Sequence, residues 1–426
     1  MTQELLSSAP ATATATADAR PAGHAGSVIE ASGPSYFPVA LAARLPYAMM
    51  VVGVLTLVVS ARDSVALGGL NSAMVGIGTA VFGPLLGAAA DRFGQRRVLV
   101  AASLVSTFAL VLMTWVVHSA LPNAAVLAVA FLIGASAPQV APMSRSRLVS
   151  LIGRRLEPAR RDRSFHATMG YESAADELVF IVGPVLVGVL ATWFGPSAPV
   201  LGAALLTAIF VTAFALHPTG RVAERHTGAE SAAAVAPVAD LFRPALLVVV
   251  LGIGAVGLFF GATLTALTAF MADSGHGDQA GLVYGAMGVG SAVLALAVGF
   301  FPARFGLAAR WVVFAAALLL GAALLPLASS VGAVSWMLVV AGVGIGPTLV
   351  TQYSLGAQRS PAGRSATVMT MLGSAIIVGQ AFASAITGQV AELWGSHAAM
   401  ALPAVAALLV AVAGVANAVI TRRHHP

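Results

Sequence analysis

Long apolar runs dominate this sequence and leave few folds open to it. A helix that crosses the hydrocarbon core of a bilayer needs about 20 mostly apolar residues. Runs of that kind are found near 37–60, 66–90, 98–118, 123–146, 166–194, 197–216, 243–272, 279–303, 309–329, 333–356, 366–394 and 397–420. Only 9% of the 426 residues are charged, too few to cover a water-facing surface. The sequence therefore predicts an all-α integral membrane protein with twelve transmembrane helices.

The basic residues predict how these spans are oriented. Loops on the cytoplasmic side of a membrane retain an excess of positive charge. If both termini are cytoplasmic, all but two of the 22 basic residues fall in inner segments. The exceptions are Arg44, inside the first span, and Arg62, in an outer loop. We therefore expect a multi-pass protein of the bacterial inner (plasma) membrane with both termini in the cytoplasm.

Composition also divides the chain into segments. Residues 1–36 are rich in Ala, Thr, Pro, Gly and Ser, and we expect them to form a disordered cytoplasmic tail. The longest later polar stretch, 217–242, predicts a flexible cytoplasmic linker. It separates six-helix bundles at 37–216 and 243–421, and a short cytoplasmic tail follows at 422–426.

The two bundles carry traces of an internal repeat. GAAADRFGQRRV at 87–98 aligns with GFFPARFGLAAR at 299–310, each after the second span of its half. Gly87, Arg92, Phe93 and Gly94 have equivalents in the second copy, but Ala303 stands where the first has Asp91. This repeat predicts two pseudo-symmetric six-helix bundles.

The first copy of the repeat resembles a loop signature of the major facilitator superfamily, G-x-L-a-D-R-x-G-R-[RK]-[RK]. The matching residues are Gly87, Asp91, Arg92, Gly94, Arg96 and Arg97, whereas Ala89 and Gln95 depart from the pattern. The resemblance covers about 37–421 and implies a secondary transporter that works by alternating access, with its substrate near the bilayer midplane.

The residue types in this loop suggest a conformational role. The glycines permit close helix approach and a tight turn. Asp91 can accept a hydrogen bond from a helix N-terminus or pair with an arginine of another helix, which would latch the two halves in one state. The alternative is that the arginines only enforce topology and bind anionic lipid headgroups.

Charges inside the spans form a second group of candidates. The fifth span contains Glu172, Asp176 and Glu177, and the first contains Arg44 at a similar depth of about 10 Å. In the resembled fold the first and fifth helices pack together within one half, which implies a pair of Arg44 with Glu172 or Asp176. Arg145 and Arg147, at the end of the fourth span, are further candidate partners. Either these charges form a neutral structural network, or one carboxylate exchanges a proton during transport.

The fifth span also resembles part of an antiporter signature, G-x8-G-x3-G-P-x2-G-G. Gly170, Gly183, Pro184 and Gly188 match, whereas Val179 and Val187 depart from it. The resemblance implies an exporter. The alternative interpretation is an ordinary bent helix, with Pro184 bending the span and the glycines allowing close packing.

A few polar residues within the spans are candidates for the lining of a central cavity: Tyr47, Gln139, Gln352, Tyr353 and Gln380. Each could equally be a helix–helix hydrogen-bonding group. The chain has no Cys, no P-loop and no histidines with metal-ligand spacing, so we expect no enzyme, cofactor or metal site. The scattered arginines give no nucleic-acid-binding stripe.

These features favour proton-coupled efflux of a small organic molecule such as a drug or secondary metabolite. The expected partners are that small-molecule substrate, protons and membrane lipids, and we expect a monomer. Uptake of a sugar, nucleoside or similar nutrient is the alternative, and a non-transporting membrane protein (a sensor or an intramembrane enzyme) is a third.

Overall fold

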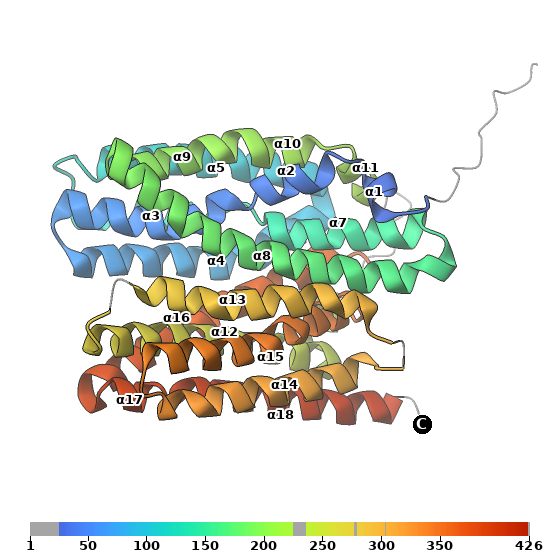
Figure 1. Cartoon of the computed structure of the whole chain (residues 1–426). Coiled ribbons are helices and arrows are strands. Elements are labelled where there is room, and N and C mark those ends of the chain that lie inside the picture. The colour runs from blue at the N-terminus through green and yellow to red at the C-terminus, as the bar shows by residue number, and fades with distance from the viewer. Residues whose placement is uncertain (1–24, 225–235, 277–278, 303, 425–426) are drawn as a thin grey trace, which may run out of the picture.

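The computed structural model describes residues 25–224, 236–276, 279–302 and 304–424 (Figure 1). Within these ranges, twelve helical spans are long and apolar enough to cross a membrane, and no β-strand is formed. Figure 1 shows the spans as two bundles lying against each other, one from the first half of the chain and one from the second. The predicted fold class is confirmed.

The first bundle contains six spans, of which three are built from more than one helix. Its helices are α2 (Tyr36–Ala42) with α3 (Leu45–Arg62), α4 (Val65–Phe93), α5 (Gln95–Val116), α6 (Asn123–Ala135) with α7 (Val140–Arg155), α8 (Pro158–Phe194), and α9 (Ala198–Leu206) with α10 (Thr212–Leu216). A π-helical turn, Thr207–Val211, joins the last two. This bundle contains five of the eight charged residues that fall within the predicted spans: Arg44, Arg145, Glu172, Asp176 and Glu177.

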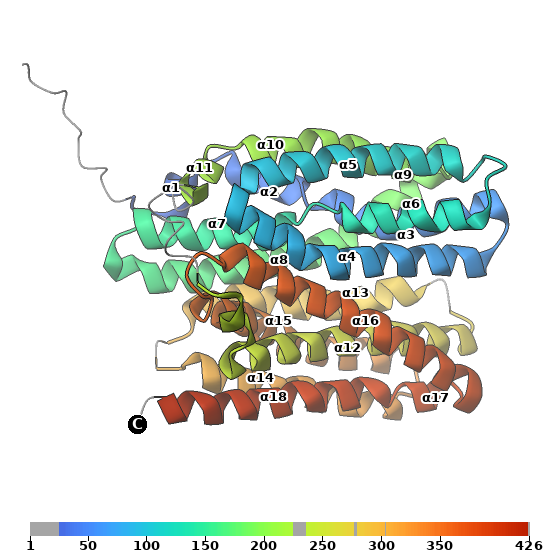
Figure 2. The same cartoon turned by 180° about the vertical axis from the view of Figure 1, so that it is seen from behind.

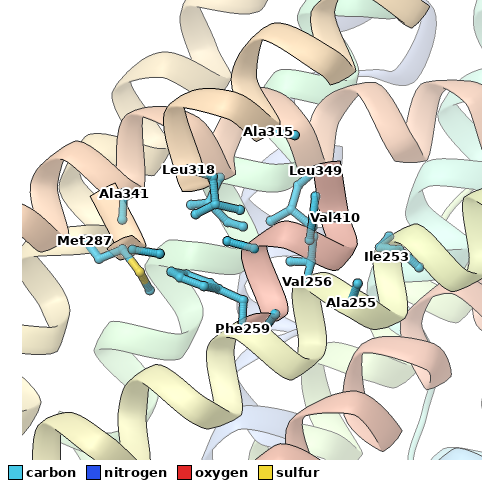
Figure 3. Packing of buried hydrophobic residues seen from close by; sticks show 14 of the residues in the cluster. Ile253, Ala255, Val256, Phe259, Met287, Ala315, Leu318, Ala341, Leu349 and Val410 are labelled. Carbon is cyan, nitrogen blue, oxygen red and sulfur yellow. The ribbon is translucent and has the colours of Figure 1, made fainter. Parts of the chain in front are cut away.

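The second bundle is more uniformly apolar. It contains α12 (Pro244–Asp273), α13 (Ala280–Ala297) with a 3-10 turn at Val298–Phe300, α14 (Leu307–Leu324), α15 (Val331–Gln358), α16 (Ser365–Trp394), and α17 (Ser396–Ala399) with α18 (Leu402–His424). Figure 3 shows part of its core, in which the labelled side chains come from α12, α13, α14, α15 and α18. This bundle is held by apolar packing.

Prolines break two spans that the sequence predicts as continuous. The first span is interrupted between Ala42 and Leu45, next to Pro46, and the fourth between Ala135 and Val140, around Pro138. Proline has no N–H to donate and disfavours helical geometry in the preceding residue. The first break places Arg44 at the N-terminus of α3.

Two helices extend beyond the predicted span ends. The fourth span continues to Arg155 and the fifth begins at Pro158, instead of 146 and 166. The additional turns are rich in arginine and therefore lack the hydropathy by which spans are recognised. A helix can continue beyond the apolar slab because water satisfies polar side chains there.

Some of the segments expected to be disordered or flexible are ordered. The expectation of disorder is wrong for 25–36, because α1 (Val28–Ser32) is capped by Ser27 and the Ala25 N–H donates to the Arg155 carbonyl at 2.8 Å. The predicted linker contains α11 (Thr219–Glu224) and a 3-10 turn at Val238–Phe242. Residues 1–24 and 225–235 lie outside the described residues.

Both described ends of the chain lie at the same end of the molecule. Figures 1 and 2 show α1 and the last turn of α18 there, together with α11 and the junction of α7 and α8. We call this end the terminal face and the opposite end the far face. The connection from α4 to α5, which carries the loop signature, is also at the terminal face.

Candidate functional site

The two bundles meet near the terminal face through Asp91, at the end of α4. Its Oδ1 accepts the backbone N–H of Ala366 at 2.9 Å, and its Oδ2 accepts that of Thr367 at 2.7 Å. The Thr367 hydroxyl adds a third bond at 2.6 Å. These donors lie in the first turn of α16, where helical N–H groups have no partner within the helix. Asp91 thus caps a helix of the opposite bundle.

Gly87 allows α4 and α16 to approach closely one turn before Asp91. A Cβ at Gly87 would lie 2.1 Å from the Thr370 hydroxyl and 2.7 Å from the Ala366 carbonyl. Gly94 has a different role, because it ends α4 with a φ of +92°, a conformation that side chains with a Cβ rarely adopt. The two glycines therefore position Asp91 against α16.

The signature arginines lie at the edge of this contact. Arg92 is exposed and lies over the Phe93 ring at 5.3 Å, Arg97 is exposed, and Arg96 is half-buried. Gln95, which replaces a basic residue of the signature, is buried, and its Oε1 accepts Arg147 Nε at 3.3 Å. A cation at this position would face the Arg147 guanidinium, so the departure from the family pattern has a local reason.

The predicted membrane charges form a buried network within the first bundle. Arg44 is ion-paired with Glu172, and its Nε lies 3.5 Å from Asp176 Oδ1. Arg145 Nη2 is 2.6 Å from Asp176 Oδ2, and the Ser144 hydroxyl donates to Glu172 at 2.9 Å. Two guanidinium groups thus face two carboxylates, and their formal charges cancel. We call these four charged residues the charge network.

Arg145 also connects the charge network to the second bundle. Its guanidinium lies 3.8 Å from the centroid of the Tyr353 ring on α15, close enough for a cation–π contact. Arg145 is only 2% exposed. Tyr353, expected as a cavity-lining candidate, is 5% exposed and covers the cation from the opposite half.

Arg147 does not join the carboxylates as expected. It lies against α5, α10 and α11 instead, where Nη1 donates to the Phe214 carbonyl at 2.9 Å and to the Thr219 hydroxyl at 3.2 Å. Its guanidinium also stacks over the Phe214 ring at 4.2 Å. Arg145 and Arg147 are two positions apart on α7, so they point about 200° apart around the helix axis. This spacing explains why only one of them reaches the network.

Glu177 also lies outside the charge network. Its Oε1 accepts the hydroxyl of Ser291, on α13 of the second bundle, at 2.6 Å. Asp176 is its neighbour in sequence, but consecutive residues of a helix point about 100° apart. The ion pairs of the described residues include no partner for Glu177.

The glycines of the partial antiporter signature have unequal roles in packing. A Cβ at Gly170 would lie 2.3 Å from the Ala295 carbonyl on α13, and one at Gly183 would lie 2.6 Å from Ala48 Cβ on α3. Among the described residues, nothing lies within 4 Å of a Cβ at Gly188. α8 continues as helix through Pro184. Close packing therefore needs Gly170 and Gly183 but not Gly188.

The remaining cavity candidates do not form one group. Gln139 lies near Gly83 of α4 and donates to the Ala137 carbonyl at 3.0 Å, and Tyr47 lies beside Thr79. Gln352 is fully buried between α12 and α15, with its amide atoms unpartnered among the described residues. Gln380 is on α16 where that helix packs against Gly261.

Sequence reasoning did not identify the hydroxyl partners of these charges. Ser144, Ser291 and Thr367 contact Glu172, Glu177 and Asp91 respectively. Serine and threonine are common in membrane helices as packing and back-bonding residues, so their identity gives no signal. Only the position of the opposite bundle selects Ser291 and Thr367.

Comparison with known proteins gives one family. The sequence model of the Major Facilitator Superfamily matches residues 36–376, which is most of the chain. No curated protein matches the sequence.

Several solved transporter structures have the same fold. The human organic anion transporter MFSD10 (TETRAN) is 18% identical with a TM-score of 0.67, covering 90% of this chain and 99% of its own. A bacterial homologue of the iron transporter ferroportin, in an outward-facing state, is 14% identical with a TM-score of 0.70 over 90% and 98%. The proton:xylose symporter XylE is 15% identical with a TM-score of 0.63 over 89% and 95%.

Proposed function

The chain belongs to the major facilitator superfamily, and from this premise we propose that it exports a small organic molecule in exchange for protons. The observation that supports a cycle of alternating access is a set of three polar contacts between the two bundles. Asp91 caps α16, Arg145 stacks on Tyr353, and Glu177 accepts from Ser291. We call these three contacts the terminal closure. Separating them would open a path from the terminal face to the middle of the bundle.

We propose that the terminal face is cytoplasmic, as the arginine distribution favours. The conformation described here is then closed to the cytoplasm. In this proposal, the bundles at 37–216 and 243–421 move as units, and the segment 217–242 links them. An outward-facing state is the one named for the ferroportin homologue, which is consistent with this assignment.

The charge network holds α3, α7 and α8 together in this proposal. Its charges are compensated, its members lie within one bundle, and Arg44 and Glu172 are almost fully buried. A group that exchanges protons with water needs access that these two residues lack. The network therefore serves the rigidity of the first bundle. The proposal of export relies instead on the partial antiporter signature of α8.

Transport in cells tests the proposal. Accumulation of candidate fluorescent organic molecules is compared in bacteria with and without the protein, each with and without a proton uncoupler. We expect the protein to lower accumulation and the uncoupler to remove the difference. If the protein instead raises the accumulation of these molecules, or of a labelled sugar or nucleoside, it works as an uptake transporter. The proton:xylose and fucose:proton symporters have the same fold.

A pair of carboxylate variants links the same assay to the terminal closure. Asp91→Asn replaces one carboxylate oxygen by an NH2 group, which cannot accept a hydrogen bond from the first turn of α16. We therefore expect transport to fall at least several-fold at equal protein level. Asp162→Asn changes an exposed carboxylate of α8 and should transport like the unchanged protein. Equal transport by both variants would contradict a role for Asp91 in the cycle.

A further inference from the structure

Glu177 is the carboxylate within the spans of the first bundle that the charge network leaves uncompensated. Glu172 and Asp176 are neutralised by Arg44 and Arg145. Glu177 instead accepts a hydrogen bond from a neutral hydroxyl, Ser291 Oγ, at 2.6 Å. A carboxylate without a counter-ion is costly inside a membrane and is better accommodated as the neutral acid.

The groups around Glu177 supply no cation. α13 contributes Ser291 and Tyr284, both neutral in their ordinary forms. On α8 itself the nearest charge is Asp176, whose like charge disfavours ionisation of a neighbour. α3 and α7 bring Arg44 and Arg145, which engage Glu172 and Asp176, and α15 brings Tyr353, which covers Arg145. The other helix and turn packed on α8, α9 and Val298–Phe300, carry no charged side chain.

The position of Glu177 differs from that of Asp91. Counted at 1.5 Å per residue from the far-face ends of their helices, Glu177 lies about 26 Å and Asp91 about 39 Å along. The Glu177–Ser291 contact is therefore about 13 Å deeper than the Asp91 contact, at the inner end of the terminal closure. Glu177 is also partly exposed, whereas Glu172 is fully buried. Asp176 of the charge network is partly exposed as well. Water entering from the far face would reach Glu177 before Glu172, which lies five residues nearer the terminal face on the same helix.

We propose that Glu177 is the proton-binding carboxyl of the transport cycle: it carries a proton while it faces Ser291 across the closed bundles and releases it when the bundles separate at the terminal face. The step is a proton transfer between the carboxyl and water, with no change of covalent partner. The assignment rests on the proposed proton coupling and names the group that provides it. Because a neutral carboxyl can be sealed between helices and a carboxylate cannot, proton occupancy sets which conformation is stable.

The test measures opening directly and needs no substrate. The chain contains no Cys, so single cysteines can be placed at the exposed Arg163 and Arg304, on opposite sides of the close approach of Gly299 to α8. Spin labels at the two sites report the distance between bundles at the terminal face. In lipid nanodiscs we expect one short distance at low pH and a growing population of longer distances as the pH rises. Glu177→Gln should keep the short distance across the whole pH range.

Two further variants make the result specific. Glu392→Gln changes an exposed carboxylate at the end of α16 and should keep the pH midpoint of the unchanged protein. Ser291→Ala removes the hydroxyl partner without touching the carboxyl and should move that midpoint. A distance that ignores pH, a Glu177→Gln protein that opens at the original midpoint, or an unmoved midpoint in Ser291→Ala would each overturn the assignment.

The transport assay separates this assignment from the proposed function. If accumulation is insensitive to the uncoupler while Glu177 still controls opening, proton-coupled transport is wrong and Glu177 remains a proton-binding group. If accumulation is uncoupler-sensitive and Glu177→Gln retains that sensitivity, the coupling is real and its assignment to Glu177 is wrong.

Discussion

Arg44 and Glu172 are 3% and 0% exposed, and Arg44 is the ion-pair partner of Glu172. Buried ion pairs are not in themselves strongly stabilising, because desolvation offsets most of their attraction. Removing one partner is different, since the remaining charge is left without compensation. The pair is therefore better understood as a constraint on which helices can lie together than as a source of stability.

This view predicts a characteristic pattern of variants. Arg44→Met should destabilise the folded protein by about 3–5 kcal/mol, because it leaves Glu172 buried beside Ser144 alone. The double variant Arg44→Met with Glu172→Met should recover most of the loss. Thermal unfolding in detergent, followed by tryptophan fluorescence, measures both. If the double variant is no more stable than the single one, the two residues do not act as a compensated pair.

At the scale of elements, the interface between the bundles depends on where small residues lie along each helix. α4 illustrates this, because a Cβ at Gly87 would overlap with atoms of α16 whereas one at Gly76 meets nothing within 4 Å among the described residues. On α8, Gly170 permits contact with α13 and Gly183 with α3. The glycines of one helix thus serve neighbours in different bundles, and only some of them can affect opening.

Gly87→Ala and Gly76→Ala therefore form a matched pair on the same helix. Both add one methyl group, but only the first is expected to weaken the terminal closure. With the spin labels at 163 and 304, we expect Gly87→Ala to raise the ratio of open to closed molecules about 5- to 150-fold, which corresponds to a coupling of 1–3 kcal/mol. Gly76→Ala should leave the ratio unchanged. Similar distance distributions for the two variants would argue against the role of Gly87.

At the scale of the whole molecule, the same twelve spans could in principle be inserted in either orientation. The structure places both described ends of the chain at the terminal face. The arginine-rich turns of α7 and α8 are at this terminal face, together with the α4–α5 connection. Their retention on the cytoplasmic side is the physical basis of the proposed orientation.

Fusions to the C-terminus of α18 test this orientation in a bacterial host. A green fluorescent protein exported through the general secretory route does not become fluorescent, whereas alkaline phosphatase needs the periplasm for activity. We expect a fluorescent green fluorescent protein fusion and an inactive phosphatase fusion. The opposite pair of results would place the terminal face outside and would reverse the direction assigned to the terminal closure.

Hydropathy predicts some features of this structure well and others not at all. Hydropathy identified every span, because each helix must be apolar over about 20 residues whatever its neighbours are. It missed the breaks at Arg44 and around Pro138 and the polar extensions of α7 and α8. It also missed the ordered segment after residue 24. In these places local hydrogen bonding and charge decide the backbone, and average hydropathy carries no information about them.

The sequence by itself determined that the protein lies in a membrane, where its twelve spans are, that its two halves are repeats, and which residues are candidates for function. Composition and spacing along the chain are sufficient for these conclusions. Only the tertiary structure decided which of those residues meet. Arg145 reaches Asp176 while Arg147 turns away, Asp91 finds the first turn of α16, and Glu177 faces Ser291 instead of a cation. These outcomes depend on the rotation and depth of helices from two bundles, which are set by packing between residues far apart in the chain.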